Sequence, residues 1–372
     1  MLQNEFLGTG SLKNIIDIIN ELDARKILLV IGKKSFTLSG AESILDILLK
    51  NKNVVKFNNF EANLKLEDVY FGIELIRQEN PDLIVAIGGG SVIDMAKLIN
   101  ILAVQTNYTA LDIINDCSLI NNKGQPLVAI PTTSGAGSQA THFAVIYIKK
   151  IKYSLSHVYI LPDYAIVDFS LSYHTPKEVA ASSAMDALSQ AVESYWSKHA
   201  TYESRKYSSK AIKLILPVIS LAINNKNKNA IQSMSLAAHL AGKAINISKT
   251  TAPHAISYTL TSHFKVPHGH AVAILIAPTA YISSQKSNKE FNLILDQILS
   301  FFGCESIHDF YDIWNNLMHE CGLSPKLINF GVSIQDLELI INNVNVERMT
   351  GHMITLERED LEDIVKLAIL GR

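Results

Sequence analysis

Four histidines lie close together in one short, largely apolar stretch of the 372-residue chain. The stretch, APHAISYTLTSHFKVPHGH, contains His254, His263, His268 and His270, whereas the whole chain has only twelve histidines. Neutral imidazole is the commonest metal ligand among protein side chains. The first question that the sequence raises is therefore whether this stretch binds a metal, and through which histidines.

A carboxylate and an amide earlier in the chain have the spacing of one helix face. Asp186 and Gln190, in MDALSQ, are four residues apart, as are His254 and Tyr258. Residues four apart on a helix point to the same side. Each pair therefore offers one ligand-type side chain together with a polar neighbour.

A proline separates two of the histidines. Pro267 should end the helical pattern that runs to Phe264, which places His268 at the start of a new, very apolar helix. Asp186, His254 and His268 would then suit a catalytic divalent ion that keeps one position open. From spacing alone, each histidine could equally be a hydrogen-bonded residue of the core.

A glycine-rich segment follows a β-type run and precedes a helical pattern. In AIGGGSVIDMAK the residues at that junction are Gly88, Gly89, Gly90 and Ser91. Glycines allow a ligand to approach the backbone closely, and the N–H groups of a helix start attract phosphate. The spacing matches neither the dinucleotide fingerprint nor the P-loop, so a tight turn remains the alternative.

A second loop of small and hydroxyl residues, PTTSGAGSQAT, follows another β-type run. It contains Thr132, Thr133 and Ser138. Two such loops at strand ends can line one cleft at the edge of an open parallel sheet. Together they favour a phosphate-containing ligand over two unrelated turns.

The elements that must position these residues differ between the two halves of the chain. Up to about residue 133, β-type runs (26–32, 53–57, 82–90, 126–133) alternate with amphipathic helical patterns, which predicts a parallel sheet covered by helices. Residues 143–168 alternate with period two and are predicted to be strands that close this sheet. After Pro176 the period is 3.6, which predicts a helical domain. The predicted domains are 1–174 and 175–372.

Composition limits the class of partner. A chain that is 48% hydrophobic can bury about two cores of ordinary size. A net charge of −2 without runs of like charge gives no footprint for nucleic acid or anionic lipid, so we expect a small-molecule partner. No leader or membrane-spanning pattern is evident, which favours the cytoplasm, and the three scattered cysteines are interpreted as buried thiols.

Six motifs in fixed order give the chain a family resemblance. The motifs GTGSL, IGGGSVIDMAK, PTTSGAGSQAT, LPDYAIVD, MDALSQAVESY and PHGHAVAILIAP resemble the iron-containing (group III) alcohol dehydrogenase family over essentially the whole chain. The resemblance implies an α/β Rossmann-like N-terminal domain and an all-α C-terminal domain, the dehydroquinate synthase-like architecture. It also implies a homodimer, with a nicotinamide cofactor and a divalent metal, Fe²⁺ first and Zn²⁺ second, in the cleft between the domains.

The family's metal ligands correspond to Asp186, position 190, His254 and His268. At position 190 the usual histidine is replaced by Gln190, and Tyr258 stands where many members have another histidine. Loss of an imidazole should weaken metal binding, although the related glycerol dehydrogenases bind their metal through one aspartate and two histidines.

The resemblance also places cofactor-binding residues in three segments. These residues are Gly32, Lys33, Lys34 and Ser35, then Gly88, Gly89, Gly90, Ser91, Asp94 and Lys97, and finally Thr132, Thr133 and Ser138. NAD-preferring members commonly carry an acid at the position of Gly32 or Lys33, whereas the lysines here could accept a ribose 2′-phosphate. We therefore expect NADPH to be used at least as well as NADH.

Within the family, DALSQAVES and the stretch 237–273 look most like the phosphonoacetaldehyde reductases, which form 2-hydroxyethylphosphonate. A phosphonate needs cationic partners, for which His142, Lys152 and His157 are candidates, although a solvated surface role is as plausible for each. Two alternatives remain: a general short-chain alcohol or polyol dehydrogenase, and a catalytically silent cofactor-binding protein that lost its chemistry through Gln190.

The alcohol oxygen that forms needs a proton. His270 and Tyr258 are the available donors, and His270 is the first choice because imidazole has the better-placed pKa near neutral pH. His263, near a predicted helix end, is interpreted as a capping or solvent-facing group.

Overall fold

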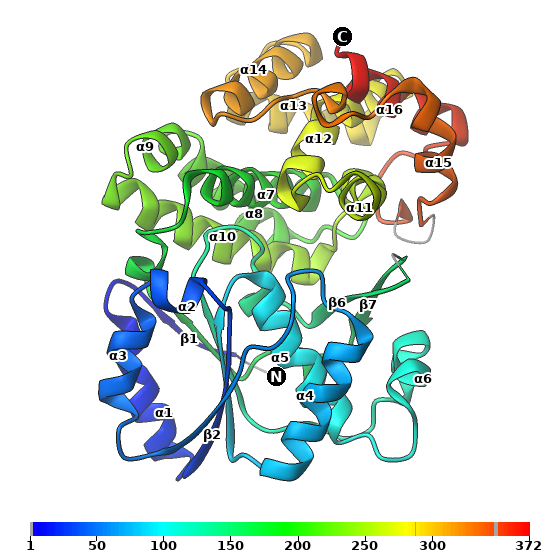
Figure 1. Ribbon diagram of the computed structural model, residues 1–372. Helices are drawn as coiled ribbons and strands as arrows, with labels where there is room; N and C mark the ends of the chain where they lie inside the picture. Colours follow the sequence, from blue (N-terminus) through cyan, green and yellow to red (C-terminus); the bar gives the residue numbers. More distant parts are fainter. Residues whose placement is uncertain (1–2, 150, 287, 346–348) are drawn as a thin grey trace. The chain divides into compact units, whose positions relative to one another are not determined.

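The computed structural model describes residues 3–149, 151–286, 288–345 and 349–372. The chain divides into two compact units, Met1–Thr175 and Pro176–Arg372 (Figure 1). This division lies one residue from the boundary that the change in periodicity predicts.

The first unit is built on a parallel sheet. Within the described residues, six strands lie in the order β1-β8-β5-β4-β2-β3. The strands are β1 (Asn4–Leu7), β2 (Lys26–Ile31), β3 (Asn53–Phe57), β4 (Leu83–Gly88), β5 (Leu127–Pro131) and β8 (Tyr164–Val167). The helices are α1 (Ile15–Glu21), α2 (Ser35–Leu38), α3 (Ala41–Leu48), α4 (Leu66–Glu79), α5 (Gly90–Ala103) and α6 (Ala110–Asn115). The predicted α/β architecture is confirmed.

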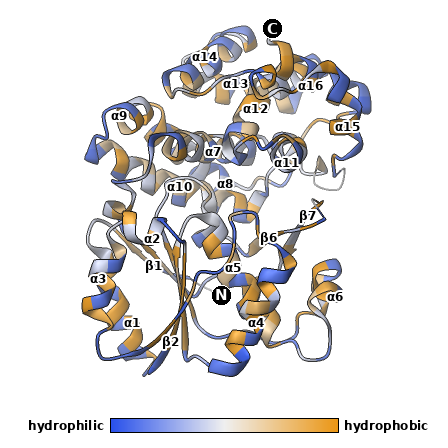
Figure 2. Ribbon diagram, viewed as in Figure 1, coloured by the Kyte–Doolittle hydropathy of each residue, from blue (hydrophilic) through white to orange (hydrophobic). Residues whose placement is uncertain are grey.

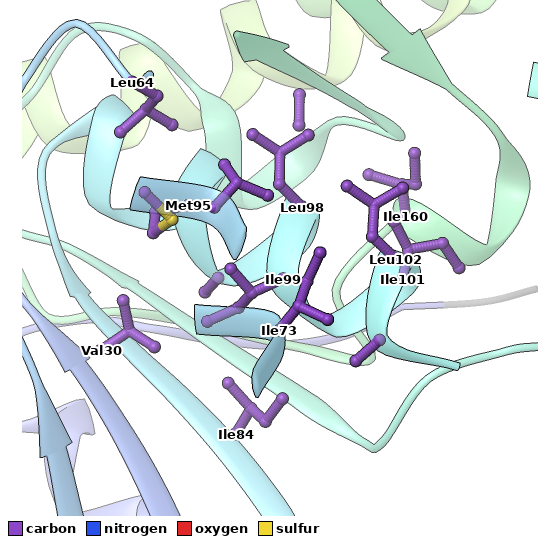
Figure 3. Packing of buried hydrophobic residues seen from close by; sticks show 14 of the residues in the cluster. Val30, Leu64, Ile73, Ile84, Met95, Leu98, Ile99, Ile101, Leu102 and Ile160 are labelled. Atoms are coloured by element: carbon purple, nitrogen blue, oxygen red, sulfur yellow. The ribbon is translucent and has the colours of Figure 1, made fainter. Parts of the chain in front are cut away.

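Two apolar cores form because successive strand residues point to opposite faces of the sheet. Val30 and Ile84 point to the face covered by α4 and α5, where they join a core with Ile73 and Ile99 (Figure 3). The neighbouring strand residues, such as Leu29, belong to the second core, on the face of α1 and α3. Helices that cover a sheet need one apolar and one polar face, and Figure 2 shows both kinds of residue on α3 and α4.

One prediction for the first unit is wrong. Residues 143–168 do not all join the main sheet: β6 (Phe143–Ile148) and β7 (Ile151–Ser156) form a separate antiparallel pair, and only β8 extends the parallel sheet. Strands joined by a connection as short as residues 149–150 must run antiparallel, whereas parallel neighbours need a crossover. Period-two alternation indicates strands but does not indicate which sheet they join.

The second unit is helical, as predicted. Its described helices are α7 (Lys177–Trp196), α8 (Tyr202–Ile215), α9 (Ile219–Asn224), α10 (Lys228–Ser248), α11 (Ala252–Phe264), α12 (His268–Gln285), α13 (Lys289–Phe302), α14 (Ile307–Glu320), α15 (Leu337–Asn342) and α16 (Arg358–Leu370). The predicted break at Pro267 is confirmed, because α11 ends at Phe264 and α12 begins at His268.

Helix α12 is the central helix of this unit. Most of its residues are buried, and it packs against α7, α11, α14 and α16. A helix that is apolar on all sides must be surrounded by other elements. Among the described helices, none has the combination of length and apolar character that crossing a membrane requires.

Candidate functional site

Three loops of the first unit begin at the same edge of its sheet. Strands β2, β4 and β5 are parallel neighbours, with Ile31 beside Ile87 and Gly88 beside Pro131. The strand order reverses direction between β2 and β4, and ligands of open α/β sheets bind at such a switch point, outside the carboxyl ends of the strands. The loops after these strands contain the residues that the sequence analysis predicts to bind the cofactor.

The loops after β4 and β5 lie side by side. Thr132 N donates a hydrogen bond to Gly88 O at 3.0 Å. A Cβ atom added to Gly90 would lie only 2.8 Å from that of Ala136, so the close packing of these loops requires a glycine at position 90.

Gly89 differs from Gly90 in this respect. Its φ of −73° is accessible to any residue, and an added Cβ would meet Thr133 at ordinary contact distances of 3.7 and 3.8 Å. The fold itself therefore does not require glycine here. Gly89 is the N-cap residue of α5, where N–H groups and the helix dipole favour an anion, and a missing side chain leaves room for one.

Asp94 and Lys97 hold the second loop in place from inside the unit. Lys97 is buried, and its Nζ donates to Ser138 O, Thr141 Oγ1 and Phe143 O at 2.6 to 3.0 Å. Asp94 accepts hydrogen bonds from the Ser138 hydroxyl and from a backbone N–H of β6. Burial lowers the pKa of Lys97 to about 8 and raises that of Asp94. These contacts favour a loop-positioning role for the pair.

In the second unit, the three predicted ligand residues come together. One ligand atom each from Asp186 on α7, His254 on α11 and His268 on α12 lie within 4.8 Å of one another. His254 Nε2 is 3.5 Å from Asp186 Oδ1, and the two imidazole rings are 5.4 Å apart at 75°. We call these three residues the ligand cluster.

A close approach of two helices brings His268 to Asp186. A Cβ atom added to Gly269 would lie 2.2 Å from Ser182 O and 2.7 Å from the Asp186 Cβ, so only glycine allows α12 to contact α7 this closely. The neighbouring His268 is thereby placed beside the carboxylate of α7. The sequence shows the glycine but not the helix against which it packs.

The surroundings of His254 stabilise positive charge. Burial alone would lower the pKa of His254, but the Glu193 carboxylate and hydrogen bonds to Asp186 and Glu193 raise it to about 10. One carboxylate and two imidazoles form a donor set that suits Fe²⁺ or Zn²⁺ with a position left open. The residues present therefore fit a divalent cation both in charge and in ligand type.

The two residues that differ from the family pattern, Gln190 and Tyr258, lie near the ligand cluster. Gln190 is buried on α7 one turn beyond Asp186, on the same helix face. Tyr258 is partly exposed, and its ring stacks on His268 with centroids 6.0 Å apart and planes inclined by 24°. A phenol hydroxyl is thus carried by a ring in contact with a candidate ligand.

His270, the first choice of proton donor from the sequence, has a ring partner outside the ligand cluster. Positions two apart on a helix differ by about 200°, so His270 and His268 leave α12 on different sides. The buried His270 ring has Nε2 2.6 Å from Ser324 O and contacts Phe330 edge-on, and burial lowers its pKa. His263, in the last turn of α11, has its Nδ1 2.9 Å from Ser262 Oγ.

The three candidates for binding a phosphonate lie along the β6–β7 pair. His157 N donates to His142 O at 3.0 Å, so these two residues are neighbours at one end. Lys152 is five residues before His157 on β7, which is about 16 Å along a strand. The described contacts therefore bring together the two histidines but not the lysine, and burial lowers the pKa of His157.

Glu193, which the sequence motifs do not single out, is a fully buried carboxylate on α7 that contacts His254 Nδ1. Glu193 follows Asp186 by seven residues, which on a helix is two turns along the same face. That spacing was the signal that could have found it. A charged residue on the buried face of a helix is informative because buried charges need partners.

Comparisons with known proteins relate both units of the chain to one enzyme family. A family model described as iron-containing alcohol dehydrogenase matches residues 3–169. A model described as the C-terminal part of the Fe-containing alcohol dehydrogenase family matches residues 180–369. Together the two models span both units of the chain.

Individual relatives match over nearly the whole length. Long-chain-alcohol dehydrogenase 1 of Geobacillus thermodenitrificans is 28% identical, over 98% of this chain and 95% of the relative. The NADPH-dependent butanol dehydrogenase of Clostridium saccharobutylicum is 29% identical, over 98% and 96%. Among solved structures, sulfoacetaldehyde reductase from Bifidobacterium kashiwanohense in complex with NAD⁺ is 25% identical over 100% of both chains, with a TM-score of 0.88.

Proposed function

We propose that this chain, which belongs to the iron-containing alcohol dehydrogenase family, reduces phosphonoacetaldehyde to 2-hydroxyethylphosphonate. In this reaction the aldehyde takes up a hydride from the reduced nicotinamide and a proton, which gives the primary alcohol and the oxidised cofactor. The family acts on CH–OH groups with NAD(H) and a divalent metal. The chain is accordingly an enzyme, and a catalytically silent binding protein is not retained as an alternative.

The substrate class is supported by one relative in particular. The sulfoacetaldehyde reductase that this chain resembles is named for a two-carbon aldehyde with a terminal anionic group. Phosphonoacetaldehyde has the same carbon skeleton, with phosphonate in place of sulfonate. His142 and His157, which a backbone hydrogen bond joins, offer imidazole N–H donors to such an anion. His157 Nδ1 accepts from Tyr159 N, which leaves Nε2 as the donor of a neutral ring.

The ligand cluster holds the metal in this proposal. Asp186 supplies the anionic ligand, and His254 and His268 supply imidazole nitrogens. The chemistry that the bound groups supply is Lewis-acid polarisation of the aldehyde oxygen and hydride donation to its carbon.

Tyr258 takes the role of proton donor to the alcohol oxygen. Its ring lies against His268, whereas the His270 imidazole is directed to Ser324. A positioned phenol is an established type of general acid. A Tyr258→Phe variant is expected to lower kcat while leaving the metal content unchanged.

The proposed cofactor is NADPH or NADH, with NADPH used at least as well as NADH. A Cβ atom added to Gly32 would lie 2.3 Å from Ser35 Oγ, so an acidic side chain does not fit at position 32 without a rearrangement. Lys33 and Lys34 follow as exposed cations beside the end of β2. A lysine there attracts a 2′-phosphate, and the absence of an acid removes the repulsion.

The cofactor proposal is tested by the ratio of kcat/KM for NADPH and NADH in the wild type and in Lys33→Ala. The ratio is expected to be at least one in the wild type and to fall in Lys33→Ala. The exposed Lys50, substituted by alanine, is the control that should leave the ratio unchanged. A wild-type preference for NADH above about tenfold, or 1.4 kcal/mol, would contradict the proposal.

The substrate proposal is tested by steady-state reduction of phosphonoacetaldehyde, sulfoacetaldehyde and butanal at saturating cofactor. We expect kcat/KM for phosphonoacetaldehyde to exceed that for butanal by more than about tenfold, since only the anion gains charge-assisted contacts. Equal or higher activity on butanal would contradict it. That result would favour the second candidate, a general short-chain alcohol dehydrogenase, which the similarity to the butanol dehydrogenase supports.

A further inference from the structure

Glu193 contacts two different parts of α11 with its two oxygens. Oε1 accepts hydrogen bonds from Thr251 N at 2.8 Å and from Thr251 Oγ1 at 3.0 Å, and it lies 3.4 Å from His254 N. Oε2 faces the Nδ1 atom of the His254 ring. One carboxylate therefore holds both the beginning of the helix and the imidazole one turn inside it.

The carboxylate is itself fixed by a chain of hydrogen bonds. The buried Trp196 Nε1 donates to Thr251 Oγ1 at 2.9 Å, and that hydroxyl donates to Glu193 Oε1. Trp196, Glu193 and Thr251 are all at most 1% exposed. Because each group is enclosed, the side chain of Glu193 has little freedom to turn away from His254.

The charge of Glu193 is compensated at this position. The N-cap residue Thr251 makes no side-chain cap to its own helix, so the first N–H groups of α11 are available to the carboxylate. A negative charge is stabilised at the positive end of a helix. The same charge attracts an N–H at His254 Nδ1.

We propose that Glu193 is a positioning residue of the metal site, which keeps the proton of His254 on Nδ1 and so leaves Nε2 to bind the ion beside Asp186. In many metal sites a carboxylate that accepts the other ring N–H of a histidine ligand fixes its tautomer and orientation. The His254 ring has the required orientation, with Nδ1 toward Glu193 and Nε2 toward Asp186. This inference rests on the proposed function, because it concerns how that site is held.

Glu193→Gln tests the tautomer directly. The amide oxygen can still accept from Thr251 N, but the NH₂ group then faces Nδ1, which would have to become the acceptor and move the ring proton to Nε2. A protonated Nε2 cannot ligate a metal. We expect the Zn²⁺ affinity, measured by chelator competition, to fall by about 10- to 100-fold, and the visible absorption spectrum of the Co²⁺-loaded protein to change.

The control is Ser189→Ala on the same helix. Ser189 is fully buried and its hydroxyl is bonded to Met185 O, so this variant also removes a buried polar group from α7. It should leave Zn²⁺ affinity and the Co²⁺ spectrum unchanged. Far-ultraviolet circular dichroism and NADPH binding should match the wild type in both variants.

A measurement on the wild type makes the test independent of whether Glu193→Gln folds. Histidine-selective ¹⁵N NMR of the Zn²⁺-loaded protein should show a ring with a proton on Nδ1 and zinc on Nε2 that disappears in His254→Ala. A folded Glu193→Gln with unchanged Zn²⁺ affinity, or a His254 ring with zinc on Nδ1, would overturn the inference alone. A wild type that binds no Zn²⁺ would overturn both this inference and the proposed metal site.

Discussion

The two units build their candidate sites from different parts of the chain. The site of the first unit consists mainly of backbone at the ends of three neighbouring strands. At Gly89 the fold has room for a side chain, yet the residue is glycine. The site of the second unit consists of side chains from three helices. Substitutions that add side-chain atoms should therefore impair the first site, and substitutions that remove side-chain atoms should impair the second.

The largest expected effect is loss of the ligand cluster. Asp186→Ala and His268→Ala should each lower kcat/KM for aldehyde reduction by about 10³-fold or more, the equivalent of roughly 4 kcal/mol of transition-state stabilisation. Cofactor binding, followed by fluorescence titration with NADPH, should change less than about threefold, because the cofactor loops belong to the other unit. Substitution of the exposed Asp296 by alanine is the control. If Asp186→Ala or His268→Ala lost NADPH affinity to a similar degree as kcat/KM, the two sites would not be separate.

A buried histidine is expected to make the stability of the second unit depend on pH. Burial lowers the pKa of His352 to about 4, from 6.5 in the unfolded chain, and its Nε2 is 2.9 Å from Ser283 Oγ. Between these pH values the unfolded state binds the extra proton, so stability is lost as the pH falls from 6.5 towards 4. The full loss is about 3 kcal/mol at most.

Urea unfolding at pH 7 and pH 4.5 measures this effect. His352→Gln should unfold with a smaller difference between the two pH values than the wild type, whereas the exposed His199→Gln should keep the wild-type difference. An unchanged pH dependence in His352→Gln would place the acid sensitivity elsewhere.

Substitutions of two neighbouring glycines in the first unit should have different effects, one on cofactor binding and the other on stability. Gly89→Ala should leave the melting temperature unchanged but raise the KM for NADPH about tenfold or more, because the new methyl group occupies space that the cofactor needs. Gly90→Ala should lower the melting temperature, because its Cβ would contact Ala136 at 2.8 Å. A Gly89→Ala enzyme with a wild-type KM for NADPH would favour the alternative, in which this loop is only a tight turn.

The smallest effect is expected at Gln190. An amide oxygen is a weaker ligand than imidazole for a first-row divalent ion, so Gln190→Ala should lower Zn²⁺ affinity by less than about tenfold and Gln190→His should raise it. Chelator competition measures both variants. If Gln190→Ala lost metal as completely as His268→Ala, the cluster would need four ligands and not three.

The contrast between the two sites also explains what could be predicted from the sequence. Glycine loops that follow β-type runs are local patterns, and parallel strands bring such loops to one edge of a sheet. The helix break at Pro267 is likewise local, and the structure confirms it. The separate β6–β7 pair was not predictable from alternation, because alternation is the same in either sheet.

Features that depend on packing between helices could be predicted only in part. The spacing of Asp186, Gln190 and His254 gives the face of each helix but not which faces meet. The direction of His270 follows from helix geometry, yet its contact with Ser324 O depends on a distant loop. Glu193 was missed because its partner lies on another helix, although its spacing from Asp186 marks the same face.

Whether Asp186, His254 and His268 hold one divalent metal is decided by the metal content of the purified protein. The wild type and His254→Ala would be loaded with Fe²⁺ or Zn²⁺, dialysed and analysed for elements alongside their rates. We expect about one equivalent of metal per chain in the wild type, and loss of both metal and aldehyde reduction in His254→Ala. A wild type without stoichiometric metal whose rate is unaffected by chelators, or a His254→Ala protein that keeps its full metal content, would contradict it.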